Sequence, residues 1–160
     1  WTNLQLGRPD GESGTILVTS PGSGDGKSLT ASNLAVIAAQ AGHTTLLIDG
    51  DLRRPRLHEV FDFSRAPGLT ETLQNDLDQH AMKQPLADNL CVLPAGMEVE
   101  SPAKVLGSAR FRDFLGEAQQ YFDHIIVDSS PVLATADGPM LSDLCDTTLC
   151  VARAAATTED

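Results

Sequence analysis

The strongest constraint on the fold is a glycine-rich turn that follows an apolar segment and ends in Gly-Lys-Ser. Residues 15–28 read Thr-Ile-Leu-Val-Thr-Ser-Pro-Gly-Ser-Gly-Asp-Gly-Lys-Ser. Because glycine tolerates positive φ, such a turn can point several backbone N–H groups at one anion. A helix expected over 28–41 would add the partial positive charge of its N-terminus. We therefore predict a phosphate-binding loop made of Gly22, Ser23, Gly24, Asp25, Gly26, Lys27, Ser28 and Leu29.

Two side chains at the end of this loop carry the expected chemistry. Lys27 can reach the β- and γ-phosphates of a nucleotide, and Ser28 can offer its hydroxyl to Mg²⁺. The loop departs from the strict G-x-x-x-x-G-K-[ST] pattern, because Pro21 stands at the first glycine position. The alternative is a turn that merely joins two elements, but this leaves unexplained why Lys-Ser stands where the helix begins.

The rest of the chain alternates between short apolar runs and helical patterns. Continuous apolar runs are typical of strands covered on both faces, and strands alternating with helices favour a parallel sheet. The sequence predicts an α/β fold: a P-loop NTPase-like, mostly parallel sheet with helices on both faces, in three layers (α/β/α). It is interpreted as one domain over 1–160, truncated at both ends. The expected strands are 15–19, 44–48, 90–93, 124–127 and 147–152, and the expected helices are 28–41, 55–61, 69–77 and 109–122.

Aspartates follow two of these apolar runs. Asp49 and Asp51 follow the run at 44–48, and Asp128 follows the run at 124–127. Since ligands bind at the carboxyl ends of strands in open α/β sheets, we expect these carboxylates to converge on the bound phosphates. Mg²⁺ favours one or two carboxylates together with phosphate oxygens and water. For Asp49 and Asp51 the alternative is a role as turn or cap residues before the next helix.

We assign these carboxylates separate candidate roles. Asp128 is the candidate for holding the metal or positioning the attacking group, Asp51 is the candidate metal-linked carboxylate, and Asp49 is the candidate general base. Together with Lys27, Asp49 and Asp128 form the predicted catalytic set. The predicted metal set is Ser28, Asp51 and Asp128.

Composition excludes some classes of function. The net charge of −11 argues against non-specific nucleic-acid binding, while a nucleotide can still bind through local amides and one lysine. The three cysteines have no metal-ligand spacing, so we expect buried free thiols in a reducing compartment. No run approaches the roughly 20 apolar residues that span a bilayer, so the segment itself is expected to be cytosolic. The four scattered histidines are interpreted as structural.

These motifs together resemble the bacterial tyrosine kinases of exopolysaccharide and capsule synthesis. The resemblance rests on the order of the P-loop, the Leu-Leu-Ile-Asp-Gly-Asp-Leu-Arg-Arg-Pro run at 46–55, and the Ile-Ile-Val-Asp-Ser-Ser-Pro-Val run at 125–132. It implies that Lys27 and the loop amides bind ATP, that Ser28 and Asp128 hold Mg²⁺ with support from Asp51, and that Asp49 activates a tyrosine hydroxyl.

The resemblance also implies partners and a location. These are ATP and ADP, a tyrosine-containing protein substrate, a transmembrane chain-length-determinant (activator) protein or a fused membrane region, and further copies of the chain in a homo-oligomer. Nucleic acid is not expected as a partner. The place of action would be the cytoplasm, at the cytosolic face of the bacterial inner membrane.

Several residues depart from the family pattern. The family usually has Asp-Thr-Pro-Pro where this chain has Asp-Ser-Ser-Pro at 128–131, so a hydroxyl is kept and one proline is lost. Tyr121 is the only tyrosine, and we expect it in a core or rim position rather than as a phosphosite. These departures leave an alternative function: a non-catalytic protein that binds a nucleotide as a switch in a polysaccharide assembly machine.

Two further alternatives are weaker. Partition and septum-placement ATPases share the fold, but they carry a signature lysine at the position of Gly22. A small-molecule kinase or synthetase of the same superfamily has no substrate signature here. The roles of Arg53 and Arg54 remain open between pairing with Asp49 and Asp51, holding a neighbouring subunit, and binding an acidic peptide.

Overall fold

A computed structural model describes residues 14–75, 82–83, 88–135 and 137–153. Its centre is a parallel five-stranded sheet in the order β3-β2-β4-β1-β5. The last two residues of the predicted helix 69–77, and His80, lie outside the described residues. The strands are β1 (Gly14–Thr19), β2 (Thr45–Asp49), β3 (Leu90–Leu93), β4 (His124–Asp128) and β5 (Thr147–Cys150).

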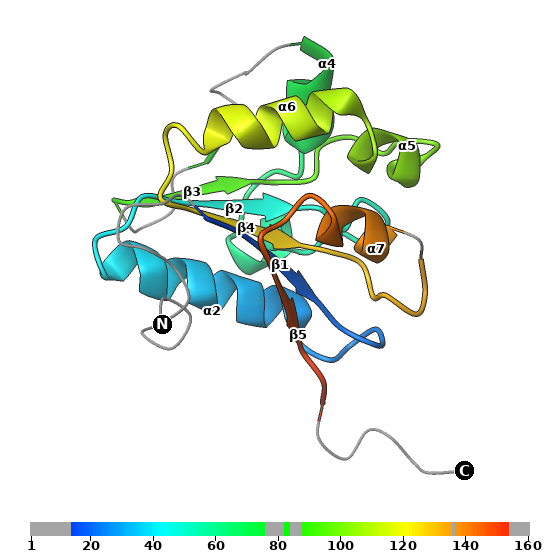
Figure 1. The fold of residues 1–160 in the computed structure, drawn as a ribbon, viewed down its shortest axis with the longest axis horizontal. Coiled ribbons are helices and arrows are strands. Elements are labelled where there is room, and N and C mark those ends of the chain that lie inside the picture. The colour runs from blue at the N-terminus through cyan, green and yellow to red at the C-terminus, as the bar shows by residue number, and fades with distance from the viewer. Residues whose placement is uncertain (1–13, 76–81, 84–87, 136, 154–160) are drawn as a thin grey trace.

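Helices cover both faces of the sheet, as the sequence predicts (Figure 1). One face carries α2 (Lys27–Gln40), and the opposite face carries the layer of α4 to α7. The short helix α3 (Leu57–Val60) buries Leu57 in the same apolar cluster as residues of α2. The opposite layer contains α4 (Leu69–Asn75), α5 (Pro102–Leu106), α6 (Ala109–Ala118) and α7 (Asp137–Ser142).

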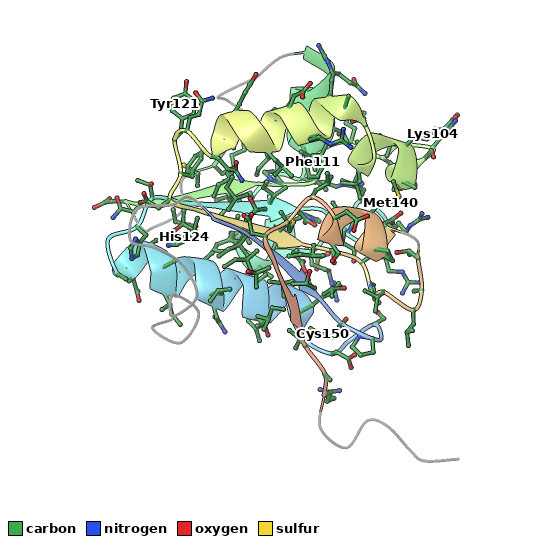
Figure 2. All side chains as sticks on the ribbon, viewed as in Figure 1. Lys104, Phe111, Tyr121, His124, Met140 and Cys150 are labelled. Carbon is green, nitrogen blue, oxygen red and sulfur yellow. The ribbon has the colours of Figure 1, made fainter. Side chains whose placement is uncertain are left out.

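The pleat of the strands divides the apolar core into two clusters. In β1, Leu17 packs in the cluster with Phe111 and Phe114 of α6, while Ile16 and Val18 pack in the cluster with α2. Successive side chains on a strand face opposite sides, so an unbroken apolar run supplies both cores at once. Figure 2 shows Phe111 lying between α6 and the sheet.

Several expectations need correction at element ends. The helix expected over 109–122 ends at Ala118. Tyr121 lies beyond it and is 72% exposed, so of the two positions expected for Tyr121 the core is excluded and the rim is left. The expectation that β5 is covered on both faces is wrong: it is an edge strand, and its residues are mostly exposed. Cys150, on this edge, is exposed, and Cys91 and Cys145 are half-buried, so the expectation that all three thiols are buried is wrong for Cys150.

Two helices are absent from the sequence prediction. Both α5 and α7 are only five or six residues long, too short to show a helical period. Among the described residues, no helix is long and apolar enough to cross a membrane.

Candidate functional site

The glycine-rich loop joins β1 to α2 and is open to solvent at its tip. Gly24 and Gly26 have φ of +89° and +92°, and a Cβ atom at either position would meet no atom within 4 Å. Backbone strain, rather than lack of space, is therefore the reason for glycine at these two positions. Within the loop, Asp25 Oδ2 accepts a hydrogen bond from Gly22 N at 3.0 Å. The predicted loop thus has two glycines with positive φ, and Ser23, Gly24, Gly26 and Leu29 are exposed.

Lys27 is the first residue of α2 and points across the loop toward β2. Its Nζ lies 3.2 Å from Asp51 Oδ2, and both side chains are largely buried. The turn that carries Asp51 is closed by a hydrogen bond from Arg54 N to Asp51 Oδ1 at 3.1 Å. The carboxylate of Asp51 is thus held between a lysine and a backbone amide.

The carboxyl ends of β2 and β4 lie side by side and bring Asp49 next to Asp128. These two residues are partners in the register of the parallel pair. Gly50 N donates to Asp128 O at 2.8 Å, and a Cβ atom on Gly50 would lie 2.8 Å from that same oxygen. Only glycine permits this approach without a shift. Gly50 is a site residue that the sequence prediction omitted, although its place between two aspartates is a usable signal.

Asp49 is fully buried and already has a structural role. Its Oδ2 accepts hydrogen bonds from Arg56 N at 3.0 Å and from Leu57 N at 2.9 Å, where α3 begins. The alternative interpretation of Asp49 as a cap is therefore correct for one oxygen. The other oxygen, Oδ1, is buried and has no hydrogen-bond partner among the described residues. Burial first, and then the charge of Asp128, raise the pKa of Asp49 to about 7.

Asp128 is the least satisfied polar group at this edge of the sheet. It is fully buried, and neither carboxylate oxygen accepts a well-formed hydrogen bond from a described residue. Burial raises its pKa to about 7, against the opposing effects of the nearby Ser28 hydroxyl and of Lys27. Buried carboxylate oxygens are rarely left without partners, so either a proton or a bound cation could neutralise this group.

The donor set fits Mg²⁺ only in combination with a nucleotide. Within the described ranges, no group of three or more His, Cys, Asp or Glu side chains could hold a metal ion alone. Mg²⁺ commonly binds through one or two carboxylates plus substrate phosphates and water. Ser28 and Asp128 beside an open phosphate loop supply that partial set, while Asp51 is engaged by Lys27.

Arg53 does not form an ion pair with Asp49 or Asp51. Its Nε donates to Asp137 Oδ2 at 2.8 Å, and its Nη2 donates to Asp137 Oδ1 at 3.3 Å. This hydrogen bonding raises the pKa of Arg53. Asp137 is buried at the start of α7 and also accepts a hydrogen bond from Ser130 Oγ at 3.3 Å. The sequence prediction assigned no site role to Asp137 or Ser130.

The fold and site place the chain among known nucleotide-binding proteins. The family model for the CobQ/CobB/MinD/ParA nucleotide binding domain matches residues 16–120, which include the P-loop and the Asp49–Asp51 turn. The chain belongs to this family.

Within the family, similar proteins are bacterial tyrosine kinases, which confirms the resemblance read from the motifs. The chain is 37% identical to the tyrosine-protein kinase YwqD of Bacillus subtilis (strain 168), over 91% of this chain and 62% of that protein. It is 36% identical to the tyrosine-protein kinase CpsD of Streptococcus pneumoniae, over 94% of this chain and 66% of that protein.

A solved structure agrees with these relatives. The kinase domain of the Escherichia coli tyrosine kinase ETK superposes with a TM-score of 0.91 at 30% identity, covering 98% of this chain and 62% of that one. The predicted α/β fold with a P-loop is thereby confirmed. The chain spans less than two thirds of the length of YwqD and of CpsD.

Proposed function

We propose that this chain binds Mg·ATP and transfers the γ-phosphate to tyrosine hydroxyls of a protein, in the regulation of capsule or exopolysaccharide synthesis. The names of its relatives support the kinase class. The observation that carries the proposal is Asp128, whose two buried oxygens accept no well-formed hydrogen bond from a described residue and which lies beside Ser28 and Lys27 at the phosphate loop.

In this proposal, each residue of the site has a separate role in the transfer. The loop amides and Lys27 would hold the phosphates, with Lys27 shared between the nucleotide and Asp51, 3.2 Å away. Ser28 and Asp128 would hold Mg²⁺, supported by Asp51, and the bound ion would neutralise charge on the β- and γ-phosphates. Asp49 Oδ1 would accept the proton of the tyrosine hydroxyl, whose pKa near 10 makes the neutral phenol a weak nucleophile.

A second candidate function is a nucleotide switch without phosphoryl transfer. It is favoured by the surroundings of Asp49, which is fully buried and has one oxygen committed to two backbone amides at the start of α3. A base in that position reaches a substrate only if the β2–α3 turn moves. The Asp-Ser-Ser-Pro sequence at 128–131 also departs from the kinase pattern.

A transfer assay separates the two functions. The purified protein is incubated with Mg²⁺, ATP labelled at the γ-phosphate and a Glu/Tyr copolymer, and phosphotyrosine is detected. We expect label on tyrosine in the wild type, a strong loss in Asp128→Asn, and full activity in the matched control Asp143→Asn, an exposed aspartate. A blank assay with ADP still bound would support the switch, whereas no nucleotide binding would contradict both functions.

The family resemblance also motivates partners beyond the nucleotide. We propose that the protein acts as a homo-oligomer at the cytosolic face of the inner membrane, together with a transmembrane activator or a fused membrane region. The measurement is sedimentation of the protein from cell extract with inner-membrane vesicles. Recovery in the supernatant alone, with or without Mg·ATP, would contradict the location.

A further inference from the structure

We propose that Arg53, Asp137 and Ser130 form a clamp that positions Asp51 relative to Asp128, so that Arg53 and Asp137 are positioning residues for Mg²⁺-dependent nucleotide binding. This inference rests on the proposed nucleotide site. It assigns a function to three polar side chains that lie outside the phosphate loop and that no proposed catalytic step uses.

The two loops joined by the clamp leave neighbouring strands. The β2–α3 turn begins after Asp49, the loop to α7 begins after Asp128, and these two residues are register partners. Their separation is fixed at the strand ends by the hydrogen bond from Gly50 N to Asp128 O at 2.8 Å. Beyond that point, no backbone hydrogen bond links the described residues of the two loops, so their relative position depends on side chains.

Arg53 supplies a two-point link between the loops. Its Nε and Nη2 atoms donate to the two different oxygens of Asp137, at 2.8 and 3.3 Å. A guanidinium that uses two N–H groups on one carboxylate fixes direction as well as distance. The Asp137 side chain is 1% exposed and that of Arg53 is 44% exposed, so the link closes over a buried anion.

Ser130, two residues after the end of β4, contacts the same carboxylate. Its hydroxyl donates to Asp137 Oδ2 at 3.3 Å and lies 2.8 Å from Thr135 Oγ1. The carboxylate of Asp137 is therefore held from both loops at once.

The position of Asp51 depends on this link through a short turn. Arg53 lies two residues after Asp51, and the turn between them is closed by Arg54 N donating to Asp51 Oδ1 at 3.1 Å. The other oxygen of Asp51 contacts Lys27 at 3.2 Å. Release of Arg53 would free the turn to move, and Asp51 would then lose its fixed place between Lys27 and the metal-binding residues. Residues that orient the ligands of a metal site change metal affinity even though they do not touch the metal.

The test is ADP binding by calorimetry, with and without Mg²⁺, on the wild type, Arg53→Gln, Asp137→Asn and the double variant. The gain in ADP affinity on adding Mg²⁺ is expected to fall about tenfold in each single variant, the lower end of losses seen for such positioning groups. The double variant should lose no more than the stronger single variant, because both changes break one link. ADP affinity in EDTA should stay within about twofold of the wild type, because the loop amides and Lys27 are intact.

Matched controls separate positioning from loss of fold. Arg54→Gln removes the neighbouring arginine, whose exposed side chain is not part of the clamp, and should keep the full Mg²⁺ gain. Ser130→Ala removes the weakest contact and should cost less than Asp137→Asn. Circular dichroism and thermal unfolding check that each variant is folded.

The outcomes are distinct. A Mg²⁺ gain that is unchanged in Arg53→Gln and Asp137→Asn, or reduced equally in Arg54→Gln, would overturn the clamp while leaving the proposed function intact. A wild-type protein that does not bind ADP under any condition would overturn the proposed function, and the role of the clamp with it.

Discussion

Lys27 and Asp51 form an ion pair across the phosphate loop, with Nζ 3.2 Å from Oδ2 and both side chains largely buried. The lysine that the motif assigns to the phosphates is thus oriented by a carboxylate from the end of β2. Because the partners come from the first turn of α2 and the turn after β2, the pair also links two parts of the site. A nucleotide phosphate arriving here would compete with Asp51 for the same ammonium group.

Substitution of Lys27 should therefore affect both binding and stability. We expect Lys27→Met to weaken ADP binding by about tenfold or more, since a hydrogen bond to a charged group is worth about 1.5–3 kcal/mol. It also leaves Asp51 buried without its cation, so the free energy of unfolding should fall. Isothermal calorimetry and chemical denaturation measure the two effects.

A double variant and a surface control make this prediction specific. Lys27→Met combined with Asp51→Asn should be more stable than Lys27→Met alone, because the second substitution removes the buried charge that the first leaves without its cation. Lys104→Met, which removes an exposed lysine of α5, should leave ADP affinity unchanged (Figure 2). Unchanged ADP affinity in Lys27→Met would refute the assignment of the phosphate loop.

The buried carboxylate of Asp128 should make the protein less stable as pH rises in the absence of Mg²⁺. Its pKa is raised from 3.8 to about 7 by burial, so the folded state favours the protonated form. A raised carboxyl pKa contributes stability that is complete below the unfolded pKa near 4 and is lost as pH rises through 7. Three pKa units set an upper limit of about 4 kcal/mol for this loss.

Asp128→Asn removes the titration and gives the test. In EDTA, the variant should be more stable than the wild type at pH 8, and the difference should shrink toward pH 5. Asp143→Asn, an exposed change, should follow the wild type at every pH. The measurement is the free energy of unfolding from urea titrations. A wild type whose stability does not fall relative to Asp128→Asn between pH 5 and 8 would show that Asp128 is not buried as an unpaired acid.

Gly50 should be required for the close approach of β2 and β4. A Cβ atom at this position would lie 2.8 Å from Asp128 O and 3.0 Å from Val127 Cγ1. We expect Gly50→Ala to reduce the free energy of unfolding by about 1–3 kcal/mol and to shift Asp49 and Asp51 away from Asp128. The matched control is Gly116→Ala in α6, where a Cβ atom meets nothing within 4 Å.

The control should change stability in the opposite direction. Alanine in a helix is favoured over glycine by about 0.5–1 kcal/mol, so Gly116→Ala should be slightly more stable than the wild type. Thermal unfolding of both variants side by side checks the pair. Equal stability of Gly50→Ala and wild type would mean that the strand ends separate without cost.

The sequence predicted the sheet well because its strands are unbroken apolar runs. It also predicted that aspartates gather at two strand ends, since Asp49 and Asp51 lie at and just after the end of β2 and Asp128 ends the neighbouring strand β4. What it could not show is how side chains divide their hydrogen bonds. Arg53 stands beside Asp51 in the chain, yet its partner is Asp137, 84 residues away, and no local pattern reports such a pairing.

Periodicity failed where elements were short or lay at an edge. α5 and α7 contain too few residues for a period. β5 is an edge strand whose residues are mostly exposed, and an apolar run alone does not show whether other elements cover it. Asp49 shows a different limit. The sequence offers a cap and a general base as alternative roles for Asp49. Its two oxygens, however, have separate surroundings: one accepts hydrogen bonds at the start of α3, and the other has no hydrogen-bond partner among the described residues.

Tyr121 should not be phosphorylated by the site of its own molecule. Tyr121 lies before the start of β4, whereas Asp128 lies at the end of that strand. The length of β4, about 13 Å, therefore separates the two residues along the strand direction. Figure 2 shows its side chain pointing away from the sheet beyond α6, and it is 72% exposed.

We expect Tyr121→Phe to leave phosphorylation of a Glu/Tyr copolymer unchanged. Any label on Tyr121 itself should rise with protein concentration, as transfer between molecules requires, and mass spectrometry over a dilution series measures this. A label fraction independent of dilution would place Tyr121 within reach of its own nucleotide site and contradict the arrangement described for β4.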